Sequence, residues 1–391
     1  MRYGKSFFDR QVDRSGTEAT KWSRFDGLGF GEDDSIPLWL ADMDLSTSEE
    51  ITRALVNRAG HPIYGYTDRS PEYQRLFAER FASSHREIGV DDVVLSTGVM
   101  YSIAGALELF TETGDGVLIP RPCYHPFVAT TEALDRCPVF VDMVQGERGF
   151  GFDFADMERA AARCRAIILC NPHNPTGRIF TKDELKALSE ICERHHLIVI
   201  SDEIHSDFVY GDTAFTSISA VSRYVREHGV FCVAPTKAFN LAGIKVSAAI
   251  IFNPEMNSRF ADRARTVGIN SINLFAMEAL KAAYTQSAEW QEGLLRYLAT
   301  NRKVVADFID ESEGFVHALQ PDGTYFYWLH FPGIEDVSAR LAREARVVLN
   351  SGIDFSPLCG EWARLNFACP QSVLVHALNR IARWRKEQLG T

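Results

Sequence analysis

The chain has 391 residues, which is longer than a single hydrophobic core normally serves, so two domains are expected. Hydrophobic residues make up 46% and charged residues 24%, which is typical of a soluble globular protein. The 52 acidic and 41 basic residues give a formal net charge of −11, which disfavours binding to nucleic acid or to an anionic membrane.

The N-terminal stretch and the cysteines predict a cytoplasmic protein. The first ten residues, MRYGKSFFDR, lack the apolar core of a signal peptide, and no apolar run approaches the 18 residues of a membrane span. None of the eight cysteines forms a CxxC pair, and in a chain of this size they are expected to be buried, reduced thiols.

Short apolar runs alternate with amphipathic helical patterns through the first two thirds of the chain. One helix is predicted after Gly98, and another begins at the capping box of Thr181 and Glu184. Each apolar run ends in a polar segment. The five runs are Val93–Leu95, Val117–Ile119, Ala166–Cys170, Leu197–Ile200 and Val230–Ala234.

This alternation predicts an α/β domain with a mostly parallel sheet and helices on both faces. Ligands of such sheets bind beyond the carboxyl ends of the strands. The polar segments at those ends should therefore converge on one site. They are Ser96–Gly98, Arg121–Phe127, Asn171–Gly177, Asp202–His205 and Pro235–Lys237.

From about Thr285 the pattern changes to a second, smaller α+β domain. Helical patterns cover 288–312 and 335–346, and strand-like pieces cover Tyr325–Leu329 and Arg346–Asn350. We therefore predict a large domain over 46–285 and a small domain made of 1–45 and 286–391.

Each converging segment carries a different chemical group. Free amides at the helix that Gly98 opens suit a phosphate. Asp202 follows a buried strand, where a carboxylate is costly unless it meets a cation. Lys237 supplies an amine, Tyr124 a flat ring and Asn174 an amide. Pyridoxal phosphate requires this set: a lysine for the Schiff base, a carboxylate for the pyridine nitrogen, a stacking ring, and donors for the phenolic oxygen and the phosphate.

Several motifs in this order resemble fold-type I pyridoxal phosphate enzymes of the aminotransferase superfamily. They are NPHNPTG (171–177), SDEIH (201–205) and APTKAFNLAG (234–243). Others resemble the MalY/PatB subgroup of cystathionine β-lyase-like C–S lyases. They are KW (21–22), WLADMD (39–44), YGYT (64–67), STGV (96–99), GTYFYWL (323–329) and RLNFACP (364–370). The resemblance runs over nearly the whole chain.

The resemblance implies a role for each residue at the cofactor. Lys237 would form the Schiff base and later carry the proton, and Asp202 would face the pyridine nitrogen. Asn174 and His205 would lie near the phenolic oxygen, and Tyr124 would stack on the ring. The remaining contacts would bind phosphate: the backbone amides of Gly98, Val99 and Met100, and the hydroxyl of Thr236.

The resemblance also implies contacts beyond the cofactor ring. Arg364 would bind the α-carboxylate of an amino-acid substrate, because a guanidinium pairs with a carboxylate in a bidentate manner. Asn174 would assist it. Tyr66 would reach the phosphate of a neighbouring subunit, because enzymes of this fold have shared sites in a homodimer.

Two positions depart from the common pattern of the superfamily. Many members have arginine eight residues after the lysine, where this chain has Lys245, which can still neutralise phosphate as a point charge. Many also have tyrosine where this chain has His205, and histidine at that position favours the lyase-like subgroup.

The sequence therefore predicts a pyridoxal phosphate-dependent β-lyase that converts L-cystathionine or related cysteine S-conjugates into a thiol, pyruvate and ammonia. An aminotransferase on the same scaffold is the main alternative, since no residue separates the two reactions. A protein of this fold that binds or regulates without turnover is another. A metal-dependent hydrolase would use His173, Asp202, Glu203 and His205 as ligands, but it leaves Lys237 without a role.

Overall fold

The computed structural model describes residues 2–14, 16–23, 34–68, 70–269 and 272–389. The chain has two compact units. We call the first the sheet unit, which consists of Thr47–His173 and Arg178–Ala288. The second, called here the C-terminal unit, consists of Met1–Ser46, Asn174–Gly177 and Glu289–Thr391.

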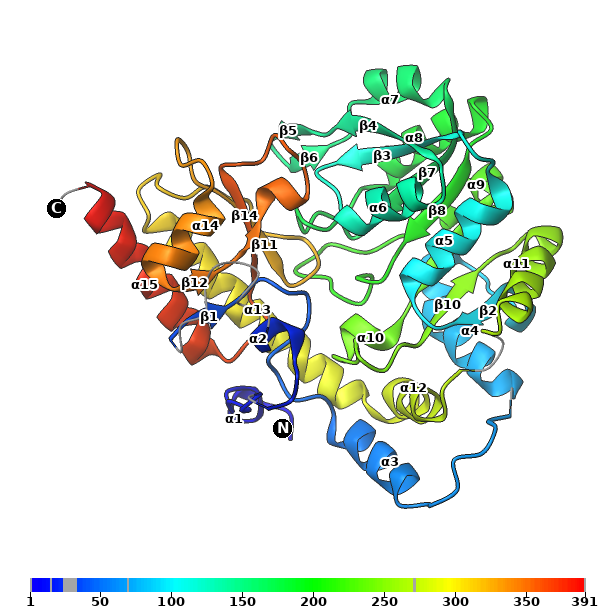
Figure 1. Ribbon diagram of the computed structural model, residues 1–391, viewed down its shortest axis with the longest axis horizontal. Coiled ribbons are helices and arrows are strands. Elements are labelled where there is room, and N and C mark those ends of the chain that lie inside the picture. The colour runs from blue at the N-terminus through cyan, green and yellow to red at the C-terminus, as the bar shows by residue number, and fades with distance from the viewer. Residues whose placement is uncertain (1, 15, 24–33, 69, 270–271, 390–391) are drawn as a thin grey trace. The chain divides into compact units, whose positions relative to one another are not determined.

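A seven-stranded sheet forms the centre of the sheet unit (Figure 1). Its strand order is β2-β10-β9-β8-β7-β3-β4, and only β10 runs antiparallel to its neighbours. The strands are β2 (Val93–Ser96), β3 (Gly116–Arg121), β4 (Cys137–Asp142), β7 (Cys164–Cys170), β8 (Ile198–Asp202), β9 (Gly229–Val233) and β10 (Ser247–Ile250). A hairpin of β5 (Val144–Gly146) and β6 (Gly149–Gly151) stands apart from it. The predicted α/β fold is confirmed.

Helices pack on both faces of this sheet, and a separate hydrophobic cluster lies on each face. The helices of the unit are α3 (Glu49–Ala59), α4 (Pro71–His85), α5 (Val99–Phe110), α6 (His125–Ala133), α7 (Phe154–Ala161), α8 (Lys182–Arg194), α9 (Arg223–Glu227), α10 (Pro235–Ala238), α11 (Pro254–Thr266) and α12 (Leu274–Gln286). One cluster involves α4, α7, α8 and α12, and the other involves α5, α6 and α11.

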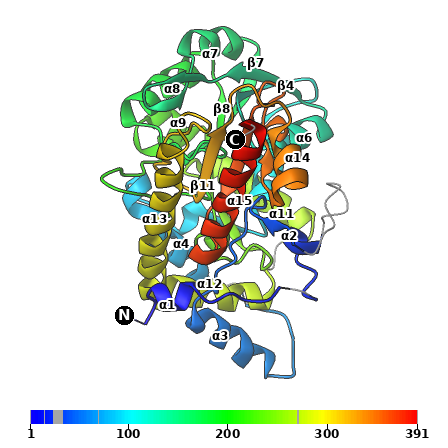
Figure 2. The same cartoon turned by 90° about the vertical axis from the view of Figure 1, so that its left-hand side faces the viewer.

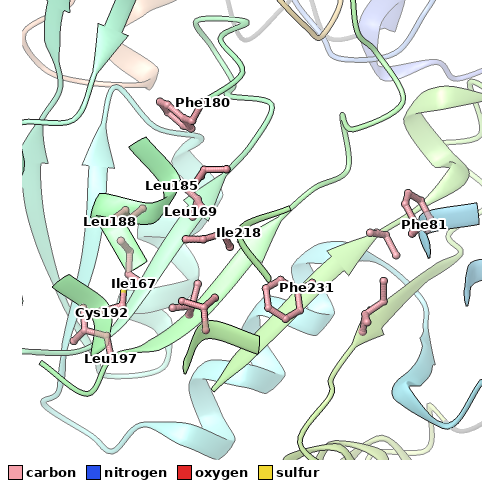
Figure 3. Packing of buried hydrophobic residues seen from close by; sticks show 14 of the residues in the cluster. Phe81, Ile167, Leu169, Phe180, Leu185, Leu188, Cys192, Leu197, Ile218 and Phe231 are labelled. Carbon is pink, nitrogen blue, oxygen red and sulfur yellow. The ribbon is translucent and has the colours of Figure 1, made fainter. Parts of the chain in front are cut away.

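The packing of α8 explains how the central strands are buried. Its apolar residues Leu185 and Leu188 share a cluster with Ile167 and Leu169 of β7 (Figure 3). Alternate residues of β7 belong to the cluster on the opposite face. Because both faces of the strand are covered, it is apolar from Ala166 to Cys170, and polar residues collect at its ends.

Local sequence signals set the helix starts. The Thr181 hydroxyl accepts from the Glu184 amide at 3.2 Å, and the Glu184 carboxylate accepts from the Thr181 amide at 2.9 Å. This capping box stabilises the start of α8 by about 1 kcal/mol. The predicted helix start at this position is confirmed.

Two strands of the sheet do not follow from the apolar pattern. In β4 buried and partly exposed residues alternate, as expected at the edge of a sheet. In β10 the sequence SAAI has small residues and only four positions, so it lacks a strong strand signal.

The C-terminal unit contains a three-stranded antiparallel sheet and two long helices, α13 (Ala288–Asp310) and α15 (Gln371–Leu389) (Figure 2). The sheet consists of β11 (Phe326–His330), β14 (Trp362–Asn366) and β13 (Asn350–Ser351). A parallel pair joins β1 (Ile36–Pro37) to β12 (Val347–Val348). The short helices are α1 (Lys5–Phe8), α2 (Thr20–Ser23) and α14 (Val337–Arg340).

The helix predicted over 335–346 is shorter and irregular. After α14 the chain continues as a π-helical turn over Leu341–Ala345, and Arg346 has a left-handed φ of 57°. The strand predicted over Arg346–Asn350 is split between β12 and β13. In the part of the chain that the structure describes, no helix combines the length and the apolar character that crossing a membrane requires.

A buried ion network fastens the N-terminal segment within the C-terminal unit. The Lys21 ammonium is fully buried and lies 2.6 Å from the Asp44 carboxylate. The Arg14 guanidinium lies 2.7 Å from both Asp42 and Asp44. The Trp22 indole also donates to Asp44, at 3.1 Å. The KW and WLADMD motifs therefore meet in one charge-compensated cluster.

Candidate active site

Asp202 lies at the centre of the sheet unit, as the last residue of β8. It pairs with Cys170 on β7 and with Cys232 on β9, and its residue surface is only 5% exposed. The Ile204 amide donates to its Oδ1 at 3.1 Å. Asp202 is therefore held inside the strand end, where a buried carboxylate requires a cationic partner.

The electrostatics of Asp202 are unusual for an aspartate. Burial raises its pKa to about 7, although the Ile204 amide and the Lys237 ammonium both act to lower it. Lys237 is half-buried in α10, the single helical turn that follows β9. The sheet therefore brings the predicted lysine and the predicted carboxylate to the same edge, close enough to interact.

The three residues whose amides are predicted to bind phosphate lie at the start of α5. Gly98 is the N-cap, and Val99 and Met100 are the first two helical residues. A Cβ built on Gly98 would meet nothing within 4 Å, so the position that a larger side chain would fill at this N-cap is open. The N-terminal amides of a twelve-residue helix suit a dianionic phosphate.

Three further predicted residues follow strands of the same sheet. Tyr124, after β3, is the half-buried N-cap of α6, and its ring lies edge-on to Phe127 at 5.5 Å. His205, three residues after the end of β8, is 3% exposed. Thr236, in α10, is 8% exposed. An aromatic ring, an imidazole and a hydroxyl are thus available at this edge.

Lys245 and Tyr66 are more exposed. Lys245 precedes β10, whose first residue Ser247 pairs with Ser96 at the end of β2. Because β10 is antiparallel, its start lies at the same edge as the carboxyl ends of the other strands. Tyr66 lies between α3 and α4, and its side chain is fully exposed at 106%.

Arg364 and Asn174 both belong to the C-terminal unit and contact each other directly. Arg364, on β14, is 2% exposed, and its Nη1 donates to Asn174 Oδ1 at 2.8 Å. Its Nη2 donates to the carbonyl oxygen of Trp39, also at 2.8 Å. The guanidinium carbon lies 4.2 Å from the ring centre of Phe326 and 5.0 Å from that of Phe355.

These contacts fix the orientation of the Arg364 guanidinium. Two aromatic rings hold its plane, and two oxygens hold its ends. The sequence did not identify Phe326, Phe355 or the Trp39 carbonyl as partners. Phe326 stands two residues after Thr324 in the GTYFYWL motif, and Trp39 opens WLADMD, so the motifs contain them without showing their role.

The residues present fit pyridoxal phosphate. Asp202 offers a buried carboxylate to a protonated ring nitrogen, Lys237 offers an amine, and the start of α5 offers amides to a phosphate. When bound, the cofactor supplies an electron sink for the negative charge that develops at the substrate Cα.

The metal-site alternative finds no matching geometry. Among the residues that the structure describes, no group of three or more histidine, cysteine, aspartate or glutamate side chains is arranged to bind a metal ion. Glu203, one of the four proposed ligands, instead lies 3.0 Å from the buried His85.

Comparisons with known proteins identify the family of the chain. The chain is 32% identical over 381 residues to cystathionine beta-lyase PatB of Bacillus subtilis (strain 168), covering 96% of this chain and 98% of the relative. It is 31% identical to Protein MalY of Escherichia coli (strain K12), and the match covers 94% of this chain and 95% of the relative. The structure of cystalysin from Treponema denticola contains a pyridoxal 5'-phosphate cofactor. It is similar to this chain with a TM-score of 0.92 at 26% identity, and the match covers 97% of this chain and 99% of cystalysin.

The sequence model of the family described as aminotransferase class I and II matches residues 36–381, which is most of the chain. Together with the full-length similarity to PatB and MalY and with the seven-stranded sheet, this match establishes the family. The chain belongs to the aminotransferase class I and II family of fold-type I pyridoxal phosphate enzymes, in the subgroup of PatB and MalY.

Proposed function

We propose that the protein is a carbon–sulfur β-lyase that converts L-cystathionine or a related cysteine S-conjugate into a thiol, pyruvate and ammonia. The observation that carries the chemistry is the buried Asp202 carboxylate with Lys237 at the same sheet edge. The similarity to cystathionine beta-lyase PatB over 96% of the chain supports the choice of a lyase.

Lys237 is the proposed covalent attachment point for the cofactor and the proposed base. Once the substrate has displaced it, its Nζ amine takes the proton from the substrate Cα. Asp202 keeps the ring nitrogen protonated, because a carboxylate beside that nitrogen stabilises its positive charge. The electrons left at Cα then expel the thiolate from Cβ.

Arg364 is the proposed anchor for the substrate α-carboxylate. Its guanidinium is already oriented by Asn174, by the Trp39 carbonyl and by the flanking rings of Phe326 and Phe355. A charged donor held in one orientation loses little conformational entropy when it binds a carboxylate. This orientation would direct the Cα–H bond of the substrate.

The other polar residues would hold and orient the cofactor. Tyr124 would stack on its ring, while Asn174 and His205 would donate to its phenolic oxygen. The amides at Gly98, Val99 and Met100 and the Thr236 hydroxyl would bind its phosphate, and Lys245 would add a positive charge. Because β10 places Lys245 at this edge and Lys245 is exposed, we assign it the weakest phosphate contact.

We further propose a homodimer in which Tyr66 of one subunit reaches the phosphate of the other. The support is an exposed apolar segment between α3 and α4. Ile63 is 68% exposed and Tyr64 is 56% exposed, next to the fully exposed Tyr66. Three exposed apolar side chains within four residues are costly on a free surface and typical of an interface.

We propose that the sheet unit is the cofactor domain, corresponding to the large domain predicted over 46–285, and that the C-terminal unit is the small domain. We also propose a cytoplasmic location. None of the eight cysteines forms a disulfide, which suits a reducing compartment.

An aminotransferase is the second candidate, because the family is described by that activity. A product assay separates the two reactions. The lyase predicts pyruvate release from L-cystathionine with no keto acid added, at a rate unchanged when one is supplied. Turnover that requires a keto acid and returns the amino group to it would identify an aminotransferase. No turnover of either kind by protein with bound cofactor would indicate a binding or regulatory protein.

A further inference from the structure

A second buried ionisable pair lies directly behind Asp202. Glu203 is the next residue in the chain and is 1% exposed. Its Oε2 lies 3.0 Å from Nε2 of His85, which is fully buried at the end of α4. Neither side chain has a role in the chemistry proposed above, and two buried ionisable groups are costly unless they are paired and hydrogen-bonded.

The surroundings of His85 fix which ring nitrogen faces Glu203. The Ser84 hydroxyl donates to the carbonyl oxygen of Phe81 at 3.0 Å. His85 Nδ1 lies 3.3 Å from that same oxygen and 3.2 Å from the Ser84 oxygen, so it acts as a donor. Nε2 faces the Glu203 carboxylate, so a proton on Nε2 would give His85 the positive charge that neutralises Glu203.

The other oxygen of Glu203 is held equally firmly. Its Oε1 accepts from the Ser217 hydroxyl at 2.7 Å and from the Ser201 hydroxyl at 3.0 Å. Ser217 is in turn 3.0 Å from the Ser219 hydroxyl. The network therefore ties the end of β8, where Asp202 lies, to the segment around 217–219 and, through His85, to α4.

Few other charges face this pair. The Arg226 guanidinium, on α9, donates to the backbone oxygen of His85 at 2.8 Å and lies over the ring of Phe252. Cys232, on β9, remains a thiol because burial raises its pKa well above the ordinary value. On the cofactor side stand Asp202 itself and Lys237.

We propose that His85 and Glu203 are positioning residues for the cofactor site: His85 neutralises Glu203, so that Asp202 stays ionised to pair with the ring nitrogen. Glu203 acts to raise the pKa of Asp202, so its charge opposes ionisation of its neighbour, and a positive charge on His85 would reduce that effect. The low-polarity surroundings strengthen this coupling, since the rings of Phe231 and Phe252 flank His85 at 5.7 and 6.4 Å.

The test measures cofactor binding rather than turnover, so it does not depend on whether the enzyme is a lyase or an aminotransferase. It does rest on the proposed role of Asp202. The dissociation constant of pyridoxal phosphate from the apo-protein is measured by tryptophan fluorescence between pH 5 and 9. The acid limb of this profile reports ionisation of Asp202. Asp202→Asn should abolish the limb, and a limb that survives would refute the role of Asp202 instead.

His85→Gln should move the acid limb to higher pH by about one unit. At pH 6.5 the variant should bind pyridoxal phosphate up to about tenfold more weakly. Adding Glu203→Gln to that variant should return the limb to the wild-type position or below it, because both charges are then gone. If His85→Gln acted only by damaging the structure, adding Glu203→Gln would move the limb further to higher pH instead of restoring it. An unmoved limb in His85→Gln, or a larger upward shift in the double variant, overturns the proposal.

The chain offers a matched control. His195, just before β8, lies 2.7 Å from Glu158, which gives a second histidine–glutamate pair at the opposite end of the same strand. His195→Gln should leave the acid limb in place. Should His85→Gln fail to fold, the proposal is tested by the double variant that combines His85→Gln with Glu203→Gln. Its limb must lie at or below the wild-type position, and a limb above it contradicts the proposal.

Discussion

Two buried carboxylates in this protein have opposite electrostatic properties. In the C-terminal unit, burial alone would raise the pKa of Asp44, but the ammonium of Lys21 and the guanidinium of Arg14 bring it below its ordinary value. In the sheet unit, burial raises the pKa of Asp202 to about 7, and Lys237 offsets only part of that rise.

The difference separates a structural charge from a functional one. Asp44 is compensated by its own chain, so its ion pairs stabilise the fold. The chain compensates Asp202 only in part, and a carboxylate held in this state can pair with a cationic ring nitrogen. Perturbed carboxylates of this kind are concentrated at functional sites.

Lys237→Ala should have the largest effect. Removal of the amine abolishes covalent attachment and proton transfer, so kcat should fall by at least about 10⁴-fold while circular dichroism shows an intact fold. Pyruvate release from L-cystathionine measures the loss. Lys186→Ala, on the exposed face of α8, is the control and should leave kcat unchanged. Near-normal turnover of Lys237→Ala would rule out the mechanism.

Asp202→Asn should separate activity from stability. Without the carboxylate the ring nitrogen is no longer kept protonated, so kcat should fall by about 10³-fold. The cofactor-free protein should instead become more stable. The folded pKa of Asp202 is raised, so the wild type loses stability as pH rises from about 4 to about 7.

The expected gain of the Asp202→Asn apo-protein is therefore largest above pH 7, at most about 4 kcal/mol, and absent below pH 4. Denaturant unfolding at pH 4 and pH 8 measures it. Equal stability changes at both pH values would show that the pKa of Asp202 is not raised in the folded apo-protein.

Lys21→Met tests the compensated carboxylate, Asp44. It leaves Asp44 partly uncompensated, so the free energy of unfolding should fall by about 3 kcal/mol at neutral pH. The folded pKa of Asp44 is lowered, so its contribution is present above pH 4 and disappears as pH falls through that value. The variant should therefore lose less stability in acid than the wild type does.

Lys303→Met is the control for that experiment, because Lys303 pairs with Asp307 on the exposed face of α13. It should change stability little, since surface pairs contribute weakly. A similar loss in both variants would mean that burial of the Lys21 pair has no special importance.

Arg364→Ala should have the smallest effect on chemistry and act mainly on binding. Loss of a charged donor should raise KM for L-cystathionine by about 10- to 100-fold with a smaller change in kcat. Steady-state kinetics measures both constants. Arg364→Lys keeps the charge but not the bidentate geometry, and should be intermediate. An unchanged KM would remove Arg364 from the site.

Part of the site could be read from the sequence because it depends on local order. Asp202, Lys237 and Gly98 each follow an apolar run, and parallel strands bring such positions to one edge. The edge strand β4 and the small-residue strand β10 could not be read in the same way, because their apolar patterns are weak. Without β10, the place of Lys245 at that edge was unknown.

The sequence by itself determined the α/β class, the polar strand ends and the motifs of the family, since these follow from local periodicity and residue order. Only the tertiary structure decided which charges are neutralised. The pairing of Lys21 with Asp44, of His85 with Glu203, and of Arg364 with Asn174 joins residues from separate segments. The burial that sets the strength of each pair exists only in the folded chain.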